Sequence, residues 1–401
     1  MTTLSSRPRT GTGRRALLFV LAGNMLIDAL EVSVVLVALP AVGRDLGLSA
    51  VAGQWVMSGF AAGFAALLLL GPRLVARWGR RRVYLAALPV FIAASVAGGL
   101  ADQGAVLIAT RVVKGMCAAL TAPTGLGIIS TTFRPGPEQR RAVSVYSLFG
   151  AAGFTAGLLA SGALTTLSWR WNPVFPAPFA LLLLIAGVRL IPRDTAPTAA
   201  APLRATLARL VRNGPFVRSA VCAATLNGTY LGLLLLLTHR LNDQWGWSSW
   251  RTALAFLPAC VPLALALPFA GRMVGRFGTE RLIAAGGCAA AAGCATALLT
   301  GPPGTYVTGV LPALLCVEAG FVLAFAALNL QATAGMSAEH RGAAVPVYQT
   351  AVQLGAVLAL PAVTVTAVGG YRRALLLLTA LSTAGALAAG PTRLRKAHGT
   401  P

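Results

Sequence analysis

Five charged side chains stand inside stretches of this sequence that are otherwise nearly all apolar. Three are acids and two are bases: Asp28, Glu31, Glu318, Arg111 and Lys114. An ionised group in an apolar medium is costly, so each must pair with an opposite charge, exchange a proton or face a wet cavity. Asp28 and Glu31, within NMLIDALEVSVVLVALP, are three residues apart and share one helical face. The chemistry open to them is proton exchange or cation binding.

The elements that must position these groups are membrane-spanning helices. Of the 401 residues, 56% are hydrophobic and 11% are charged, which is unlike a soluble domain. About 20 apolar residues cross the hydrocarbon core as a helix. The sequence predicts twelve such stretches, at 16–39, 51–71, 83–100, 104–130, 143–167, 173–191, 216–238, 250–271, 281–300, 305–332, 343–367 and 374–390. The first is too long for a signal-peptide core and lacks a convincing cleavage site, so we expect it to be retained.

The distribution of basic residues predicts the topology, because Lys and Arg near helix ends are kept on the cytoplasmic side. With the N-terminus inside, 25 of the 33 basic residues fall in inner segments and six in outer loops. The remaining two are Arg111 and Lys114, within the fourth stretch. This asymmetry predicts a multi-pass protein of the cell membrane with both termini in the cytoplasm.

The net charge of +23 is dispersed over short loops and forms no patch interleaved with aromatic residues. We therefore expect anionic membrane lipids, and no nucleic acid, as its partner. The cysteines show no metal-ligand spacing, and the three histidines, His239, His340 and His398, fall in loops or the tail. Neither lysine, Lys114 or Lys396, follows a glycine as in an ATP-binding loop. We expect no metal, no cofactor and no enzyme activity.

The sequence contains an internal repeat. GPRLVARWGRRRVYLAA, from Gly71, aligns with AGRMVGRFGTERLIAA, from Ala270, at an offset of 199 residues, and PEQRRA at 137–142 matches AEHRGA at 338–343. A six-plus-six duplication of this kind is typical of a transporter with two helical bundles around a midplane site. We expect an all-α fold with a cytoplasmic tail at 1–15, a six-helix bundle at 16–191, a cytoplasmic linker at 192–215, a second six-helix bundle at 216–390 and a tail at 391–401.

Several motifs resemble those of the major facilitator superfamily, and in particular its drug:proton antiporters. LEVSVVLVALP, residues 30–40, is similar to the first-helix signature L-D-x-T-V-V-N-V-A-L-P, with Glu31 at the acid position. QWVMSGF, residues 54–60, resembles the start of the second helix of those exporters, and WRWNP, residues 169–173, resembles their corner between helices 5 and 6. The resemblance implies a twelve-helix transporter that works by alternating access.

The loop motif G-x-L-A-D-R-x-G-R-R of that family is matched in both halves. The matching residues are Gly71, Leu74, Arg77, Gly79, Arg80 and Arg81, and then Gly271, Arg276 and Gly278. The acidic position holds Ala76 in one copy and Gly275 in the other. The resemblance implies a gating loop, and the alternative is a basic loop that only sets topology.

Two further motifs lie in the predicted fourth and fifth helices. RVVKGMCAA, from Arg111, resembles the proton-coupling motif R-x-x-Q-G-x-G-x-A with Lys114 in place of Gln. GFTAGLLASG, residues 153–162, resembles the antiporter signature G-x-x-x-G-P-x-x-G-G, with Gly153, Gly157 and Gly162 retained. A small-residue face for close helix packing is the alternative for this second motif.

Counting about 1.5 Å per residue along the helices places Asp28 near the depth of Lys114 and Glu31 near that of Arg111. Two acids would thus meet two bases across one cavity. We expect a conformational change or an arriving substrate to toggle the protonation of these carboxylates. A purely structural ion pair is the alternative.

Glu318 matches no family motif and is a second candidate site for a proton or a cation. Other polar residues of the second half could line the substrate cavity, or could simply bond to neighbouring helices. They are Asn227, Tyr230, Asn329, Gln349 and Gln353.

The sequence favours a proton-coupled exporter of small amphipathic organic compounds, a drug or antibiotic efflux protein that acts as a monomer. Uptake, uniport or exchange of a small metabolite by the same fold is the alternative. Lys114 and the degenerate motif at 153–162 favour it, and Lys114 suits an anionic substrate. Fold cannot decide between the two.

Overall fold

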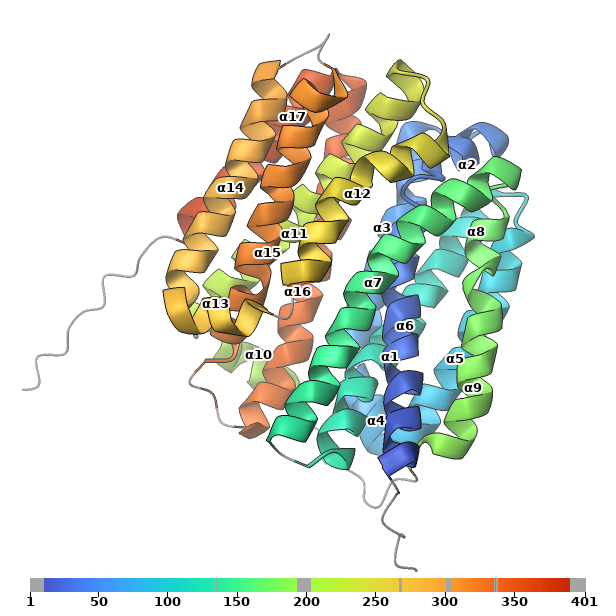
Figure 1. The fold of residues 1–401 in the computed structure, drawn as a ribbon, viewed down its shortest axis with the longest axis vertical. Helices are drawn as coiled ribbons and strands as arrows, with labels where there is room; N and C mark the ends of the chain where they lie inside the picture. Colours follow the sequence, from blue (N-terminus) through green and yellow to red (C-terminus); the bar gives the residue numbers. More distant parts are fainter. Residues whose placement is uncertain are drawn as a thin grey trace, which may run out of the picture.

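The structure is a computed structural model that describes residues 11–134, 136–192, 203–266, 269–300, 305–334, 336 and 338–389. Every regular element in these ranges is helical, and the long helices form two six-helix bundles that lie side by side (Figure 1). This confirms the predicted fold class.

The first bundle is built from elements that run to Leu190. In chain order they are α1 (Gly11–Ser33), α2 (Leu39–Asp45), α3 (Ala50–Leu68), α4 (Gly71–Trp78), α5 (Arg80–Gly99), α6 (Gly104–Thr132), α7 (Pro137–Leu167), α8 (Trp171–Val174) and α9 (Pro176–Leu190). The short helices α2, α4 and α8 join the six long ones.

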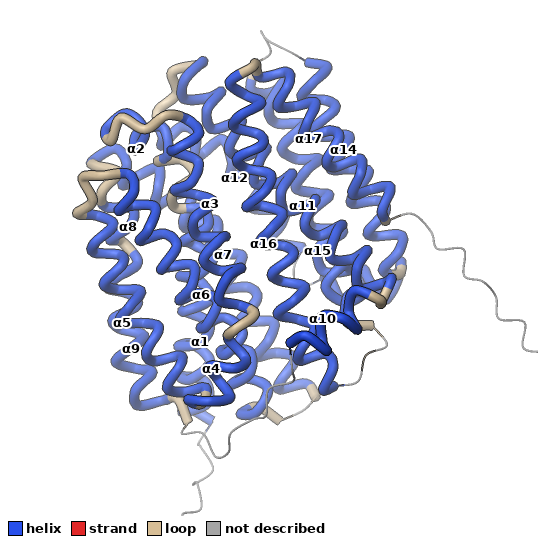
Figure 2. The backbone as a smooth tube through the Cα atoms, turned by 180° about the vertical axis from the view of Figure 1, so that it is seen from behind, coloured by secondary structure: helices blue, strands red, loops and turns tan. Residues whose placement is uncertain are grey.

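The second bundle follows a short helix in the region expected to be the linker. The elements are α10 (Leu203–Val211), α11 (Gly214–His239), a π-helical turn (Arg240–Gln244), α12 (Ser249–Ala266), α13 (Ala270–Phe277), α14 (Thr279–Thr300), a second π-helical turn (Tyr306–Val310), α15 (Leu311–Ala332), α16 (Ala338–Val368) and α17 (Tyr371–Ala388). Figure 2 shows α10 from behind, beside α11 and α16, which it contacts. Residues 193–202 of the expected linker lie outside the described residues.

Ten helices among the described residues are long and apolar enough to cross a membrane. The other two long helices are α12, part of which lies outside the described side chains, and α17, whose hydropathy is lowered by Arg372 and Arg373 in its first turn. Both run alongside the rest of their bundle (Figure 1). The twelve predicted stretches therefore each correspond to a long helix.

The outer end of the first predicted stretch is wrong. We expected one helix over 16–39, but α1 ends at Ser33 and residues 34–38 form turns before α2. Val34 and Val35 are β-branched and favour a helix weakly, while Pro40 suits the first turn of a new helix. The described residues after the break give the Leu30 and Ser33 carbonyls a backbone donor but give none to the Glu31 carbonyl.

The two copies of the loop motif, expected to be loops, form equivalent structures that are mostly helical. Each copy is an eight-residue helix, α4 or α13, which ends at a glycine with positive φ. The angle is +84° at Gly79 and +80° at Gly278, a conformation that glycine adopts without a steric penalty. The chain then turns directly into the next long helix.

The buried apolar residues reveal how the bundles meet. We call the end with α2 and α8 the α2 end, and the end with α4 and α13 the α4 end (Figure 1). One hydrophobic cluster combines residues of both bundles, including Leu36, Leu158, Leu234 and Phe256. Two further clusters each belong to a single bundle. Of the three hydrophobic clusters formed by the described residues, only one is shared by the two bundles.

Contacts across the boundary place that shared core toward the α2 end. Helix α7 packs on α12, and an ideal Cβ at Gly162, near the end of α7, would lie 2.6 Å from the Cβ of Ala253. Arg44, in α2, forms an ion pair of 3.9 Å with Asp243, which follows α11. The molecule is closed at the α2 end.

Candidate functional site

Glu31 lies at the centre of a buried charge cluster between α1, α6 and α8. Its side chain is fully buried, as are those of Arg111 and Lys114 in α6. Arg111 Nη1 forms an ion pair with Glu31 Oε2, and Lys114 Nζ lies 2.5 Å from Glu31 Oε1. One carboxylate thus binds two cations, which we call the Glu31 triad.

Arg111 also binds two backbone carbonyls, one at the break after α1 and one within α3. Its Nη2 donates to the carbonyl of Glu31 at 2.7 Å, and its Nε donates to the carbonyl of Val56 at 2.9 Å. The guanidinium carbon lies 5.0 Å from the centre of the Phe60 ring. A planar fork of donors can hold a carboxylate and two carbonyls at once, which a lysine ammonium cannot match in geometry.

Lys114 connects the triad to the corner motif at 169–173. Its ammonium donates to the carbonyl of Pro173, in α8, at 3.1 Å and lies 4.9 Å from the centre of the Phe91 ring. The carbonyls and ring faces supply partial negative charge, which offsets the second positive charge of the cluster. Three of the sequence motifs therefore meet at Glu31.

Asp28 does not pair with a base, so the expected meeting of two acids with two bases is wrong in this part. Its Oδ2 accepts hydrogen bonds from Asn24 at 2.8 Å and from Thr121 at 3.0 Å. Asp28 is 7% exposed, and no ion pair of the described residues includes it. Glu31 takes both cations, and the partner of Asp28 in α6 is the neutral Thr121, seven residues beyond Lys114.

Glu318, in α15, lies in the second bundle, away from the triad. It is 1% exposed, and its titratable neighbours are Tyr230 in α11 and Cys260 in α12. The Tyr230 hydroxyl lies near enough to interact with the Glu318 carboxylate. In the described part of the chain, however, neither carboxylate oxygen accepts a hydrogen bond of good distance and angle. Its surroundings therefore differ from those of Glu31.

The other polar residues predicted to line the cavity form local contacts. Gln349 Nε2 donates to Asn329 Oδ1 at 3.2 Å, and Asn227 Nδ2 donates to the carbonyl of Val352 at 3.0 Å. Tyr230 is buried, and the other four residues are partly exposed: Asn227, Asn329, Gln349 and Gln353. These contacts join α11, α15 and α16, and the lining of a cavity stays a prediction.

The glycines of the motif at 153–162 allow close contact between helices. An ideal Cβ at Gly153 would lie 2.9 Å from the Cα of Leu26, and one at Gly157 would lie 2.7 Å from the carbonyl oxygen of Leu30. These two glycines therefore bring α7 against the part of α1 that leads up to Glu31. Gly162 instead faces Ala253 in the second bundle.

The residues of the loop motif lie at the α4 end. Arg80 donates to the carbonyl of Gly127 in α6 at 3.3 Å, and Arg81 donates to the carbonyl of Val188 in α9 at 2.5 Å. Gly71 is buried, Leu74 is partly exposed and Arg77 is exposed. In the second copy, Arg276 lies over the Phe277 ring at 5.5 Å, and of Gly271 only its position in α13 is described.

Two contributors to the site were missed from the sequence. Ser33, two residues after Glu31, donates to the carbonyl of Phe154 in α7 at 2.7 Å. The Phe154 ring lies 6.0 Å from that of Tyr230, so it reaches the second bundle. Ser33 and Pro173 lie within the segments 30–40 and 169–173 that resemble family motifs, but the accepting carbonyls of Phe154 and Pro173 carry no residue-type signal.

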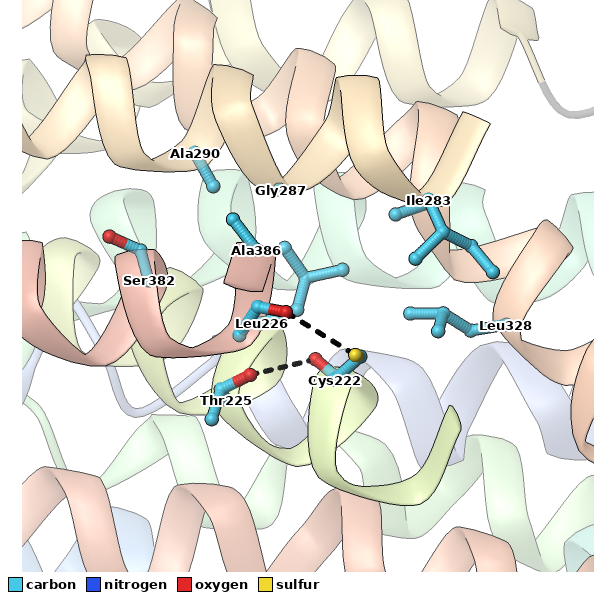
Figure 3. Close-up of a pocket in the computed structure, with 11 residues that line it drawn as sticks. Cys222, Thr225, Leu226, Ile283, Gly287, Ala290, Leu328, Ser382 and Ala386 are labelled. Atoms are coloured by element: carbon cyan, nitrogen blue, oxygen red, sulfur yellow. Dashed lines mark hydrogen bonds between the residues drawn. The ribbon is translucent and has the colours of Figure 1, made fainter. Parts of the chain in front are cut away.

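Figure 3 shows a cavity in the second bundle that is not a substrate site. It is lined by Cys222, Thr225, Ile283, Leu328, Ser382 and neighbouring small residues. Its volume of about 20 Å³ holds about one water molecule. The Cys222 thiol donates to the carbonyl of Gly385 at 3.3 Å, so its polar groups are satisfied locally.

Known proteins similar to this chain are membrane transporters. Residues 21–360 match the family model described as Major Facilitator Superfamily. The puromycin resistance protein pur8 of Streptomyces alboniger is 32% identical over 85% of this chain and 79% of its own length. The cephamycin export protein CmcT of Amycolatopsis lactamdurans is 29% identical over 90% of this chain and 86% of its own length.

The fold is also similar to that of solved transporters. A crystal structure of a single-residue variant of the nucleoside transporter NupG superposes with a TM-score of 0.75. The match covers 93% of this chain and 98% of that one at 13% sequence identity. This likeness concerns the arrangement of helices alone.

Proposed function

Because this chain belongs to the Major Facilitator Superfamily of membrane transporters, we propose that it exports small amphipathic organic compounds in exchange for protons. Its relatives include a puromycin resistance protein and a cephamycin export protein. Both names concern antibiotics, which supports export of compounds of that kind from the cytoplasm through the cell membrane. The protein would act as a monomer, with both termini in the cytoplasm.

The observation that carries the proposal is the Glu31 triad. For a buried carboxylate between two buried cations, the cations favour its charged form, whereas burial favours its neutral form. When Glu31 takes up a proton, Arg111 and Lys114 lose their shared counter-charge in a medium of low dielectric constant. The triad then no longer holds the end of α1 against α6 and α8, so one proton can change the preference between two conformations.

The contacts of α1 suggest how this change would reach the rest of the molecule. Ser33 bonds to Phe154, and Gly157 lets α7 pack on α1. Phe154 in turn contacts Tyr230 of the second bundle. A shift at the end of α1 would thus alter the boundary between the bundles, which alternating access requires to open and close.

The closed α2 end defines the conformation in this proposal. With both termini in the cytoplasm, the α4 end faces the cytoplasm and the α2 end faces outward. The shared hydrophobic cluster would then close the outward path, so a compound would enter from the cytoplasmic side. Asp28, which lies nearer to that side along α1 than Glu31, would be the first carboxylate to meet a proton or substrate from it.

Lys114 gives little support to an uptake carrier for anions. Its ammonium is fully buried and engaged by Glu31 and the carbonyl of Pro173. A substrate anion would have to displace both partners to reach it. The same side chain instead fits a role as counter-charge to Glu31.

The experiment that tests the proposal uses the full chain in liposomes with an acidic lumen. Puromycin, cephamycin and a panel of neutral and anionic compounds are added while lumenal pH is followed. We expect at least one compound to evoke proton efflux, and Glu31→Gln to abolish it while Glu138→Gln, which changes an exposed acid, does not. Compound movement that ignores the pH gradient in the native protein would overturn proton coupling.

A further inference from the structure

The second bundle holds a buried acid that lacks the partners found at Glu31. Glu318 is 1% exposed, yet none of the ion pairs among the described residues includes it. Its two oxygens also lack a donor at full hydrogen-bond geometry in that part of the chain. A carboxylate at membrane depth without a cation is costly, and such residues mark binding sites or ion pathways. Glu318 is therefore incomplete without a cation or a proton.

Aromatic rings lie beside this carboxylate and extend along one side of α15. The Tyr230 ring lies 4.9 Å from that of Phe321, which lies 4.7 Å from that of Phe325 in a stacked arrangement. Phe321 and Phe325 follow Glu318 by three and seven residues, so all three share one helical face. The acid therefore stands at one end of a row of rings.

The row of rings lies at the boundary between the two bundles. Tyr230 contacts Phe154 of the first bundle, with ring centres 6.0 Å apart. Phe154 and Phe321 are partly exposed and pack against the hydrophobic cluster that the bundles share. Farther along the same face, Asn329 is partly exposed and accepts a hydrogen bond from Gln349. The face thus runs from a buried acid, through aromatic rings, to uncharged polar groups.

This combination matches an organic cation. A ring face attracts a positive charge, most strongly where water is excluded, and the carboxylate supplies the opposite full charge. A metal ion such as Mg²⁺ or Ca²⁺ instead needs several oxygen ligands. Glu318 is the only carboxylate among the described residues of this cluster, and its neighbours are rings and a thiol.

We propose that Glu318, with Tyr230, Phe321 and Phe154, forms a binding site for a monovalent organic cation that carries apolar or aromatic groups. We take this cation to be the exported substrate, and only this part of the inference rests on the proposed function. Its positive centre lies against Glu318 and its apolar part lies along the rings. In the empty protein a proton neutralises Glu318, so the proton and the organic cation compete for one carboxylate.

The test is equilibrium binding to the purified full chain, with two probes of the same shape. Methyltriphenylphosphonium carries a permanent positive charge, and triphenylphosphine oxide is neutral. We expect the native protein to bind the charged probe about 10-fold or more tightly than the neutral one, which corresponds to about 1.4 kcal/mol. We also expect binding of the charged probe, but not of the neutral one, to weaken as pH falls.

Two variants of Glu318 and one control locate the effect. Glu318→Gln should remove the preference for charge and its pH dependence, whereas Glu318→Asp should keep both in weakened form. Glu280→Gln, which changes an exposed acid of the same bundle, should behave as the native protein. A thermal unfolding measurement checks that each variant is folded, and Glu318→Asp provides the test if Glu318→Gln does not fold.

Three results would overturn this inference. The first is that Glu318→Gln keeps the native preference for the charged probe. The second is that Glu318→Gln loses affinity for both probes equally, and the third is that the native protein does not bind the charged probe. Binding is measured without transport, so it can succeed even if proton-coupled export fails. Conversely, export of a neutral compound need not use Glu318. Proton flux that such a compound evokes in Glu318→Gln would support the Glu31 triad, and the binding measurements alone would test the cation site.

Discussion

Arg111 and Lys114 bind the same carboxylate but support different amounts of structure. Arg111 contacts the Glu31 carboxylate and two backbone carbonyls, at the end of α1 and in α3. Lys114 contacts the carboxylate and one carbonyl in α8. Arg111 is thus the main link at the break after Ser33, whereas Lys114 mainly sets the charge of the triad.

Replacing each base by methionine should therefore give unequal losses of stability. Removing one partner of a buried ion pair costs about 3–5 kcal/mol, and we expect Arg111→Met to reach that range because the Glu31 carbonyl at the end of α1 also loses its side-chain donor. Lys114→Met should cost at least about 1 kcal/mol less, because Glu31 keeps its guanidinium partner. Denaturant unfolding of the purified protein in detergent measures both. A Lys114→Met protein as unstable as Arg111→Met would contradict this division.

Asp28 and Glu31 should respond differently to neutralisation. Among the described residues, the Asp28 carboxylate accepts only from Asn24 and Thr121, and the side-chain oxygen of an asparagine can accept the same two bonds. We expect Asp28→Asn to change the free energy of unfolding by less than about 1 kcal/mol and to retain substrate-evoked proton flux, although more slowly. The comparison is with Glu31→Gln in the same liposome assay. Complete loss of flux in Asp28→Asn would make Asp28 an essential proton carrier instead.

The residues of the triad could be predicted from the sequence, but only some of their contacts. Charge in an apolar stretch singled out Glu31, Arg111 and Lys114, and rise per residue placed Glu31 near the depth of Arg111. The assignment of Asp28 to Lys114 was wrong because depths counted from predicted helix ends are not accurate to one turn, and Asp28 instead accepts from Thr121, seven residues beyond Lys114 in α6. The carbonyl of Pro173 could not be predicted, since it depends on where α8 turns.

At the scale of elements, the glycine face of α7 fixes how closely that helix approaches α1. A Cβ at Gly157 would lie 2.7 Å from the Leu30 carbonyl oxygen and 3.0 Å from the Leu30 Cα, both of them backbone atoms that cannot rotate away. The sequence left open whether this motif serves packing or export. The structure shows the packing, and the same contact adjoins the break in α1 that carries the triad.

Gly157→Ala should therefore destabilise the protein and slow transport. Overpacking at a close helix contact costs about 1–3 kcal/mol, and here the added methyl group forces α7 away from α1. The control is Gly275→Ala in α13, where a new Cβ would have no atom within 4 Å and alanine is the better helix former. We expect the control to be neutral or slightly stabilising. Thermal unfolding and substrate-evoked proton flux should rank the two variants in this order, and equal behaviour would contradict a tight α1–α7 contact.

Most helices could be predicted from hydropathy, whereas their interruptions could not. Each of the twelve apolar stretches corresponds to a long helix in the described part of the chain, because length and composition dominate at membrane depth. The break at 34–38 contains no glycine or proline, and its only signals are the β-branched valines within it and Pro40 after it. The helices α4 and α13 were missed because eight residues with two or more arginines look like a loop on hydropathy alone.

At the scale of the whole molecule, we expect the closed α2 end to open during each transport cycle. Arg44 and Asp243 lie on opposite bundles, with side chains that are 68% and 50% exposed. In a background with the exposed Cys288 changed to Ser, a cysteine at each of the two positions can be joined by a short reducible bifunctional reagent. We expect the crosslink to reduce transport at least about 10-fold, because one conformation can no longer form, and reduction to restore it. Full transport by the crosslinked protein would show that the α2 end need not open.

The two-bundle architecture could be predicted from the repeat between the segments that start at Gly71 and Ala270. The closed end could not, because the alternating access that we propose requires one sequence to support both open and closed conformations. Contacts such as Gly162 with Ala253 join residues from opposite halves of the chain, and no repeat or periodicity specifies them. The site at Glu318 was visible as an isolated acid, but its row of rings depends on how α11 and α15 pack.

The central claim is that protonation of Glu31 couples compound movement to the pH gradient, and one comparison tests it most directly. Native protein and Glu31→Gln are placed in liposomes with a compound that evokes proton flux in the native protein. Accumulation against its gradient is measured with an imposed pH difference, and exchange at equal concentrations is measured without one. The account predicts that Glu31→Gln loses pH-driven accumulation and keeps exchange, because the fold still alternates but no longer carries the proton. Undiminished accumulation in Glu31→Gln would contradict it.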